Sequence, residues 1–168
     1  MTHALRLRPG DELMSSLKAF CRERDLDAAY VATCVGSLAR CELRLANADR
    51  DRRNEVREWR ERFEILSLVG TVSRDGAHLH AAIADANGTC VGGHLISGDV
   101  FTTAEVVLGV VPATTFRRVY DDATGFDELE VGRAEDARDA DATRRERLLC
   151  GAGVALLALG VLIGRRRP

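Results

Sequence analysis

Three of the four histidines in the chain, His78, His80 and His94, have the spacing of a metal-binding group. His78 and His80 are two residues apart in the β-prone stretch 78–84 (HLHAAIA), so both imidazoles leave the same face of a strand. His94 lies in the next β-prone stretch, 89–95 (TCVGGHL), and the DANG tetrapeptide between the two stretches is a strong hairpin-turn signal. A hairpin would bring the three imidazoles close to one point.

Three imidazoles on rigid strands suit zinc or another borderline divalent ion, and a fourth coordination position stays open to water or a ligand. An HxH pair alone also occurs on ordinary protein surfaces, so the third histidine, one hairpin away, is what favours the metal site. Gly92 and Gly93 precede His94 and permit close backbone approach, either at such a site or at a β-bulge between tightly packed strands.

Glu105 is a further candidate, because it lies in the apolar stretch 101–111 (FTTAEVVLGVV) and a carboxylate in such a strand requires a partner. It would either accept a hydrogen bond from a metal-bound imidazole or act as a general base on metal-bound water. The other interpretation is an edge-strand or interface glutamate paired with an arginine. The sequence contains no nucleophile elbow, phosphate-binding loop or dinucleotide fingerprint.

The elements that would position these residues can be predicted from the pattern of apolar residues. After a β-prone stretch at 3–8, Asp11 is a good N-cap, and Leu13, Leu17 and Cys21 lie on one face of a helix predicted over 11–24. Strands are predicted over 28–35, 38–46, 63–72, 78–84, 89–95, 101–111 and 115–120, and 47–58 is predicted to be a polar connection. One helix and about seven strands in meander order indicate an α+β fold with a mainly antiparallel sheet.

The last part of the chain differs in composition from the rest. Residues 132–147 carry ten charges in sixteen residues and are predicted to be a charged linker, whereas 148–164 is seventeen residues long and uncharged. As a helix this apolar stretch would span roughly 25 Å, the lower limit for a bilayer, and arginines flank it on both sides. We therefore expect a C-terminal transmembrane helix with a basic tail at 165–168; the alternative is an apolar helix docked on the domain. Because residues 1–10 carry no export signal, the domain is expected in the cytoplasm.

Several stretches resemble the PPC domain, the plant and prokaryote conserved domain. They are RFEILSLVGTV at 62–72, HLHAAIADANGTCVGGHL at 78–95 and TTAEVVLG at 102–109. The similarity covers about residues 3–131, so 1–131 is expected to be the PPC domain. The resemblance implies a compact α+β domain that assembles as a homotrimer. It also implies that His78, His80 and His94 occupy the three-histidine metal site of some prokaryotic members.

Charge argues against a nucleic-acid partner, although plant PPC proteins are linked to DNA through AT-hooks. Residues 1–131 hold 16 Lys and Arg against 21 Asp and Glu, so the basic excess of a DNA-binding surface is missing. The closest approach to an AT-hook, GRRRP at 164–168, lacks the Arg-Gly-Arg core.

The function expected from the sequence is thus a trimeric binding or regulatory module with a divalent metal, preferably zinc, anchored to a membrane through 148–164. The small-molecule ligand is unknown. One alternative is a metal-dependent hydrolase or lyase that uses the open coordination position. The other is a DNA-associated regulator.

Overall fold

The computed structural model describes residues 1–46 and 55–135, and Met1–Gly132 forms one compact unit. Its helix is α1 (Leu13–Glu23). The strands are β1 (Thr2–Leu7), β2 (Ala29–Arg44), β3 (Val56–Trp59), β4 (Phe63–Val72), β5 (Ala77–Ala84), β6 (Cys90–Val110), β7 (Thr114–Asp121) and β8 (Phe126–Arg133). The predicted α+β class is therefore confirmed.

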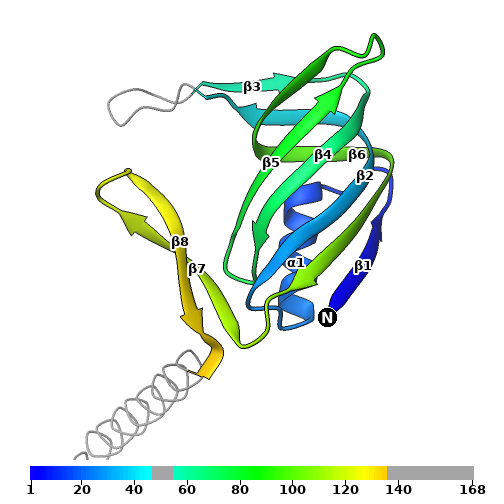
Figure 1. Cartoon of the computed structure of the whole chain (residues 1–168). Helices are drawn as coiled ribbons and strands as arrows, with labels where there is room; N and C mark the ends of the chain where they lie inside the picture. The colour runs from blue at the N-terminus through cyan, green and yellow to red at the C-terminus, as the bar shows by residue number, and fades with distance from the viewer. Residues whose placement is uncertain (47–54, 136–168) are drawn as a thin grey trace, which may run out of the picture. The chain divides into compact units, whose positions relative to one another are not determined.

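Six of the strands form one antiparallel sheet in the order β1-β6-β5-β4-β2-β3, while β7 and β8 pair separately. The long strand β2 pairs with β6 as well as with β4. Because β5 also pairs with both β4 and β6, these four strands make a closed circuit of backbone hydrogen bonds (Figure 1). The circuit gives the strands a fixed register on which side chains can be positioned.

The core follows from the alternation of side chains along each strand. In β5, Leu79, Ala81 and Ile83 are buried, so the residues between them face away from the core. Leu95 of β6 and Leu43 of β2 are fully buried register partners on the inner face. This alternation places histidines 78 and 80 together on the outer face of β5.

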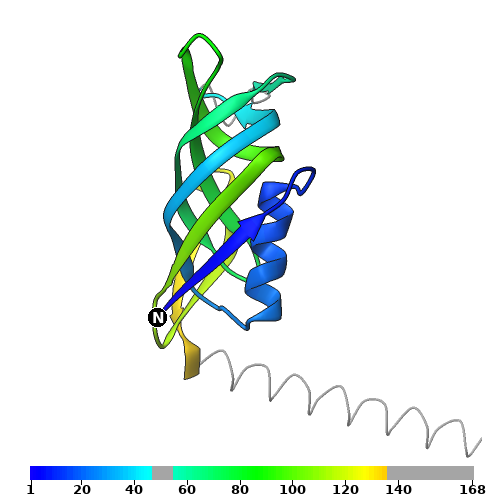
Figure 2. The same ribbon diagram turned by 90° about the vertical axis from the view of Figure 1, so that its right-hand side faces the viewer.

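Helix α1 packs along one side of the sheet, mainly against β6 (Figure 2). Its buried face carries Leu13, Met14, Leu17 and Cys21, as the apolar spacing predicted. The helix starts one residue later than predicted. Its N-cap is Glu12 rather than Asp11, and the helix begins at Leu13.

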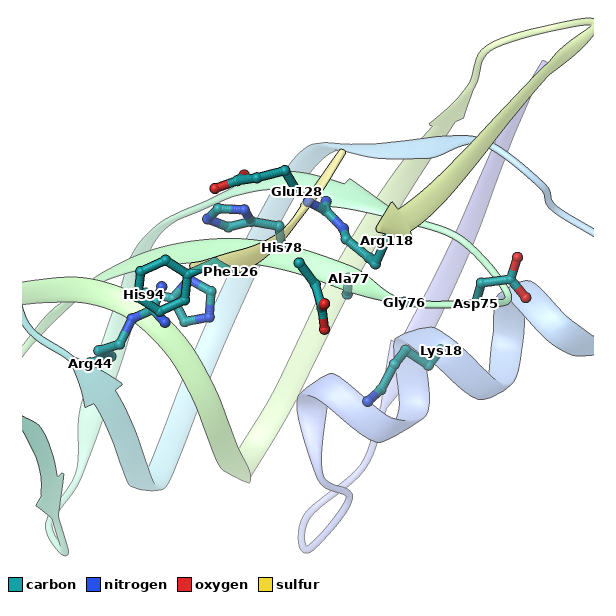
Figure 3. Close-up of a pocket in the computed structure, with 11 residues that line it drawn as sticks. Lys18, Arg44, Asp75, Gly76, Ala77, His78, His94, Arg118, Phe126 and Glu128 are labelled. Carbon is teal, nitrogen blue, oxygen red and sulfur yellow. The ribbon is translucent and has the colours of Figure 1, made fainter. Parts of the chain in front are cut away.

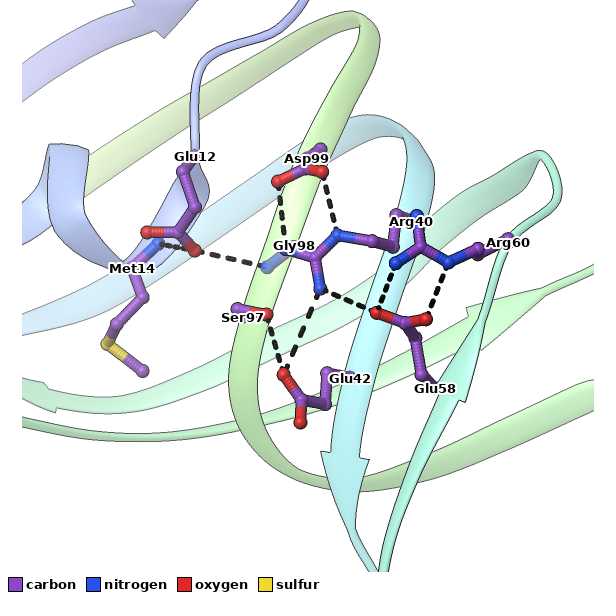
Figure 4. Close-up of polar contacts among 9 residues, drawn as sticks. All are labelled: Glu12, Met14, Arg40, Glu42, Glu58, Arg60, Ser97, Gly98 and Asp99. Atoms are coloured by element: carbon purple, nitrogen blue, oxygen red, sulfur yellow. Dashed lines mark hydrogen bonds and ion pairs between the residues drawn. The ribbon is translucent and has the colours of Figure 1, made fainter.

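Glu12 is the cap because its longer side chain reaches both the helix and β6 (Figure 4). Its Oε1 accepts hydrogen bonds from the backbone N–H of Met14 at 3.0 Å and of Gly98 at 3.1 Å, and its Oε2 accepts one from Ser15 at 2.6 Å. Burial by itself would raise the pKa of Glu12, but these hydrogen bonds outweigh it and the pKa is lowered. Asp11 instead accepts a hydrogen bond from the backbone N–H of Arg8.

The strands differ from the predicted set in four places. The stretches predicted at 28–35 and 38–46 are one strand, β2, because the chain stays paired with β6 and β4 across Gly36 and Ser37. The stretches predicted at 89–95 and 101–111 are one strand, β6, because the residues between them stay paired with β2 despite Gly98. The short β3 lies at the end of the predicted polar connection, in the part that follows 47–54. Finally, β8 occupies a stretch for which no strand was predicted.

Arg40 on β2 is the centre of an ion-pair network that joins three strands (Figure 4). Its guanidinium donates two hydrogen bonds to Asp99 of β6, at 2.7 and 3.0 Å, and one to Glu58 of β3 at 3.3 Å. The hydrogen bonds from Arg40 lower the pKa of Asp99. The network therefore ties the edge strand β3 to the middle of the sheet.

The membrane anchor predicted for 148–164 is withdrawn. Within residues 1–46 and 55–135, no helix is long and apolar enough to cross a bilayer, and the predicted segment lies outside those residues, as do most of the predicted linker and the basic tail. A run of seventeen uncharged residues is at the lower end of the roughly 17–25 residues that a membrane-spanning helix requires. The length of this run therefore does not by itself establish a membrane protein. The expected localisation, a domain anchored to a membrane by its C-terminus, is not supported.

Candidate metal centre

The three histidines are brought together by the register of the sheet. His80 of β5 is the direct partner of His94 of β6, and His94 is in turn opposite Arg44 of β2. His78 lies two residues before His80 and opposite Thr71 of β4. The predicted hairpin cluster is therefore present, and its members come from two adjacent strands.

The turn between β5 and β6 sets this register through one aspartate. Asp85 Oδ1 accepts hydrogen bonds from the backbone N–H groups of Asn87 and Thr89, both at 2.8 Å. Gly88 adopts a φ of 78°, a left-handed conformation that favours glycine. The DANG signal thus fixes a tight turn from which Ala84 pairs with Cys90 and His80 with His94.

Gly93 allows β6 to approach β2 closely beside the site. A Cβ atom at this position would lie 2.6 Å from the carbonyl oxygen of Arg44, which is closer than side chains tolerate. The close backbone approach that the sequence predicted for the glycine pair is therefore present at Gly93. The approach places His94 between Arg44 and His80 in one cross-strand row.

The geometry of the three imidazoles fits a metal ion. One nitrogen from each lies within 4.8 Å of the other two, and the Nε2 atoms of His78 and His80 are 3.1 Å apart. The Nδ1 atom of His94 is buried and has no hydrogen-bond partner among the described residues. A buried nitrogen without a partner is costly, and a metal ion would satisfy it. The set of three neutral nitrogen donors suits zinc-like ions.

Burial and neighbouring arginines keep two of these imidazoles uncharged at neutral pH. Burial, followed by the charge of Arg44, lowers the pKa of His94 to about 4. Burial and the charge of Arg118 also lower the pKa of His78, while Glu128 acts in the opposite direction. Metal ligation requires neutral imidazole, so the pocket holds His78 and His94 in the form that binds a cation.

A pocket of about 410 Å³ opens beside the histidines, and the β7–β8 hairpin contributes one of its walls (Figure 3). The lining includes two of the histidines together with three cationic and three acidic side chains: His78, His94, Lys18, Arg44, Arg118, Asp75, Asp127 and Glu128. Figure 3 shows Arg44 beside His94, and both Arg118 and Glu128 close to His78. The volume lies in the range of small-molecule binding sites.

Glu105 is not brought to the histidines within the chain. It is exposed on β6, eleven residues from His94, and its register partners are Arg6 of β1 and Val35 of β2. Of the three acidic residues that line the pocket, Glu128 of β8 lies close to His78.

Sequence reasoning also missed Arg44 and Arg118. Arg44 lies within the strand predicted at 38–46 and is the last residue of β2. It is close to His94 because β2 pairs with β6. Arg118 reaches the site because its Nη2 donates a 2.6 Å hydrogen bond to Thr71 Oγ1, the register partner of His78. Neither relation leaves a local pattern in the sequence.

Residues 1–112 match the family model of the Plants and Prokaryotes Conserved (PCC) domain. A curated relative, the bifunctional protein GlmU of Synechococcus sp. (strain JA-3-3Ab), is 40% identical over 155 residues, which cover 92% of this chain and 24% of the relative. The chain thus spans about a quarter of the length of that relative. The matched family range ends before β7, so Arg118 and Glu128 lie beyond it.

Two solved structures share the fold. The hypothetical protein from Salmonella cholerae-suis (Salmonella enterica) is 39% identical with a TM-score of 0.73, covering 80% of this chain and 94% of that protein. The metal-containing protein from Archaeoglobus fulgidus is 27% identical with a TM-score of 0.67, covering 77% of this chain and 93% of that protein. With two thirds of its length matched by the family model, the chain belongs to the Plants and Prokaryotes Conserved domain family, the PPC family that its sequence resembles.

Proposed function

We propose that this chain is a PPC-family binding module that holds one divalent metal ion, preferably zinc, on His78, His80 and His94. The observation that carries the proposal is the convergence of three imidazole nitrogens within 4.8 Å, one histidine of the set having a buried Nδ1 without a partner. The Archaeoglobus fulgidus protein of the same fold, named as metal-containing, supports it. A zinc ion held there would supply a Lewis acid with a position open to a ligand.

Metal analysis of the full chain, purified without a polyhistidine tag, tests this proposal. We expect about one zinc ion per chain in the wild type, because a zinc site with one open coordination position has three protein ligands. His78→Ala and His94→Ala should lose the metal, since two ligands remain. His3→Ala is the matched control, because His3 is a histidine on β1 outside the group. Equal metal content in all four proteins contradicts the proposal.

We also propose that the chain assembles as a homotrimer whose interface covers the outer face of β2 and β4. Three apolar side chains are exposed there: Val35 by 56%, Leu66 by 55% and Val69 by 54%. A group of exposed apolar side chains is typical of a protein–protein interface. Val69 is the register partner of His80, so such an interface would adjoin the metal centre.

Sedimentation equilibrium tests the assembly. The wild-type chain should have three times the mass of a single chain, and Val69→Glu should shift it to smaller species because the interface would have to bury a charge. Val56→Glu, on the edge strand β3, is the control and should leave the mass unchanged. A monomeric wild type overturns this part of the proposal.

A metal-dependent hydrolase is the second candidate, and Glu128 is the observation that favours it. Its carboxylate lines the pocket beside His78. A general base that acts on metal-bound water would have to lie in this position. With p-nitrophenyl acetate as substrate, the zinc-loaded wild type should then exceed free zinc in rate. Glu128→Gln should retain the metal and lose the excess. A wild type no faster than free zinc would argue for the binding module alone.

A further inference from the structure

We propose that the pocket beside the three histidines is an oxyanion subsite, in which Arg44 and Arg118 bind the carboxylate or phosphate group of a small molecule that also reaches the metal. This inference rests on the proposed metal centre and adds the chemical class of its ligand. It depends on residues that metal binding itself does not use.

Arg44 and Arg118 each lie next to a different histidine. Arg44 is the register partner of His94, and its guanidinium stacks over the Phe126 ring with 4.9 Å to the ring centre. Arg118 is held by its hydrogen bond to Thr71, the register partner of His78. The two guanidinium groups therefore flank the metal centre from two sides, one from β2 and one from β7.

Both guanidinium groups are available to a ligand. Throughout the described ranges, no ion pair involves Arg44 or Arg118, whereas Arg40 and Arg74 each pair with at least two carboxylates. Their direct contacts are a ring and a hydroxyl, which occupy only part of the planar fork of donors. Arg118 also interacts electrostatically with Glu128, without an ion pair between them. Guanidinium forks match carboxylate and phosphate oxygens with paired hydrogen bonds.

The pocket contains acidic groups too, and their placement differs from that of the cations. Lys18, Arg44 and Arg118 are all half-buried. Of the three carboxylates, Asp75 and Asp127 are exposed, and only Glu128 is half-buried. The sheltered part of the pocket therefore holds three cations and one carboxylate, which favours a negatively charged ligand.

Calorimetric titration of the zinc-loaded chain with two probes, inorganic phosphate and malonate, tests the subsite and distinguishes the two oxyanion chemistries. At least one probe should bind. Arg44→Gln and Arg118→Gln should each weaken that binding about tenfold or more, because each removes charge-assisted hydrogen bonds. Arg117→Gln is the matched control, since Arg117 neighbours Arg118 on β7 but is exposed and absent from the pocket lining. Zinc content and thermal unfolding, measured for every variant, separate loss of the subsite from loss of metal or fold.

The subsite is refuted if neither probe binds, or if binding is the same in Arg44→Gln, Arg118→Gln and wild type. Failure of the metal proposal has a different signature, because the wild-type chain would then contain no zinc. In that case probe binding to the metal-free chain that depends on both arginines still supports the subsite. If the metal-free chain binds the probe equally well with and without the two arginines, the subsite is refuted.

Discussion

His80 and His94 face each other as direct partners across β5 and β6, with ring centres 5.5 Å apart. The candidate metal centre is therefore part of the strand pairing itself. A metal bound there would cross-link two strands of the closed β-circuit, and metal binding and folding should be coupled.

Zinc should therefore raise the melting temperature of the chain. A ligand that binds only the folded state stabilises it by about 2.7 kcal/mol at 100 times its dissociation constant. Calorimetry with and without excess zinc measures this shift, and His80→Ala should abolish it. A shift that persists in His80→Ala would place the zinc elsewhere.

The stability of the metal-free chain should fall as the pH is lowered from about 6.5 to about 4. Because the pKa of His94 is about 4 in the folded chain and near 6.5 when unfolded, protons bind the unfolded state first over this interval. Below about pH 4, His94 is protonated in both the folded and the unfolded state. Its contribution to the free energy of unfolding is then fully lost, and a further decrease in pH does not change it.

Urea unfolding with a chelator present, at pH 7 and pH 5, tests this dependence. His94→Gln should lose less stability between the two pH values than the wild type, by about 1–2 kcal/mol after allowance for the partial exposure of the ring. Identical losses would show that His94 does not carry the effect.

Arg40→Met should destabilise the fold by about 1–2 kcal/mol, since Asp99 and Glu58 both lose a charged hydrogen-bond donor. Arg57→Met is the control, because Arg57 pairs with Glu55 at an exposed position and such pairs contribute about 0–1 kcal/mol. Urea unfolding of both variants gives the comparison. Equal effects would mean that the network around Arg40 behaves as an ordinary surface pair.

We expect no tight binding of A·T-rich duplex DNA at physiological salt. Residues 1–131 carry five more acidic than basic side chains, 21 against 16, and the chain lacks an Arg-Gly-Arg core. Fluorescence anisotropy with a labelled duplex measures the affinity. Salt-sensitive binding at nanomolar concentration would instead support a DNA-associated regulator.

The histidine cluster could be predicted because its determinants are local. The spacing of His78 and His80 defines a face, and the DANG turn places His94 on the next strand. Arg44 and Arg118 could not be predicted in the same way, since they meet the histidines through pairing between distant strands and through the β7–β8 hairpin. No periodicity in the sequence encodes those pairings.

The same contrast holds for the fold. The helix follows from its apolar spacing, but its cap is Glu12, whose carboxylate also accepts a third backbone hydrogen bond from Gly98, 86 residues away. The continuity of β6 could not be read locally either, because glycines and Ser97 interrupt its apolar pattern while β2 holds it in the sheet.

Anomalous diffraction at the zinc absorption edge, from crystals of the zinc-loaded chain, tests the central claim most directly. The account predicts one peak per chain, bounded by His78, His80 and His94, with a nitrogen of each about 2.0–2.1 Å away. A zinc-loaded crystal with its peak at other side chains, or with no peak between these three imidazoles, would contradict it.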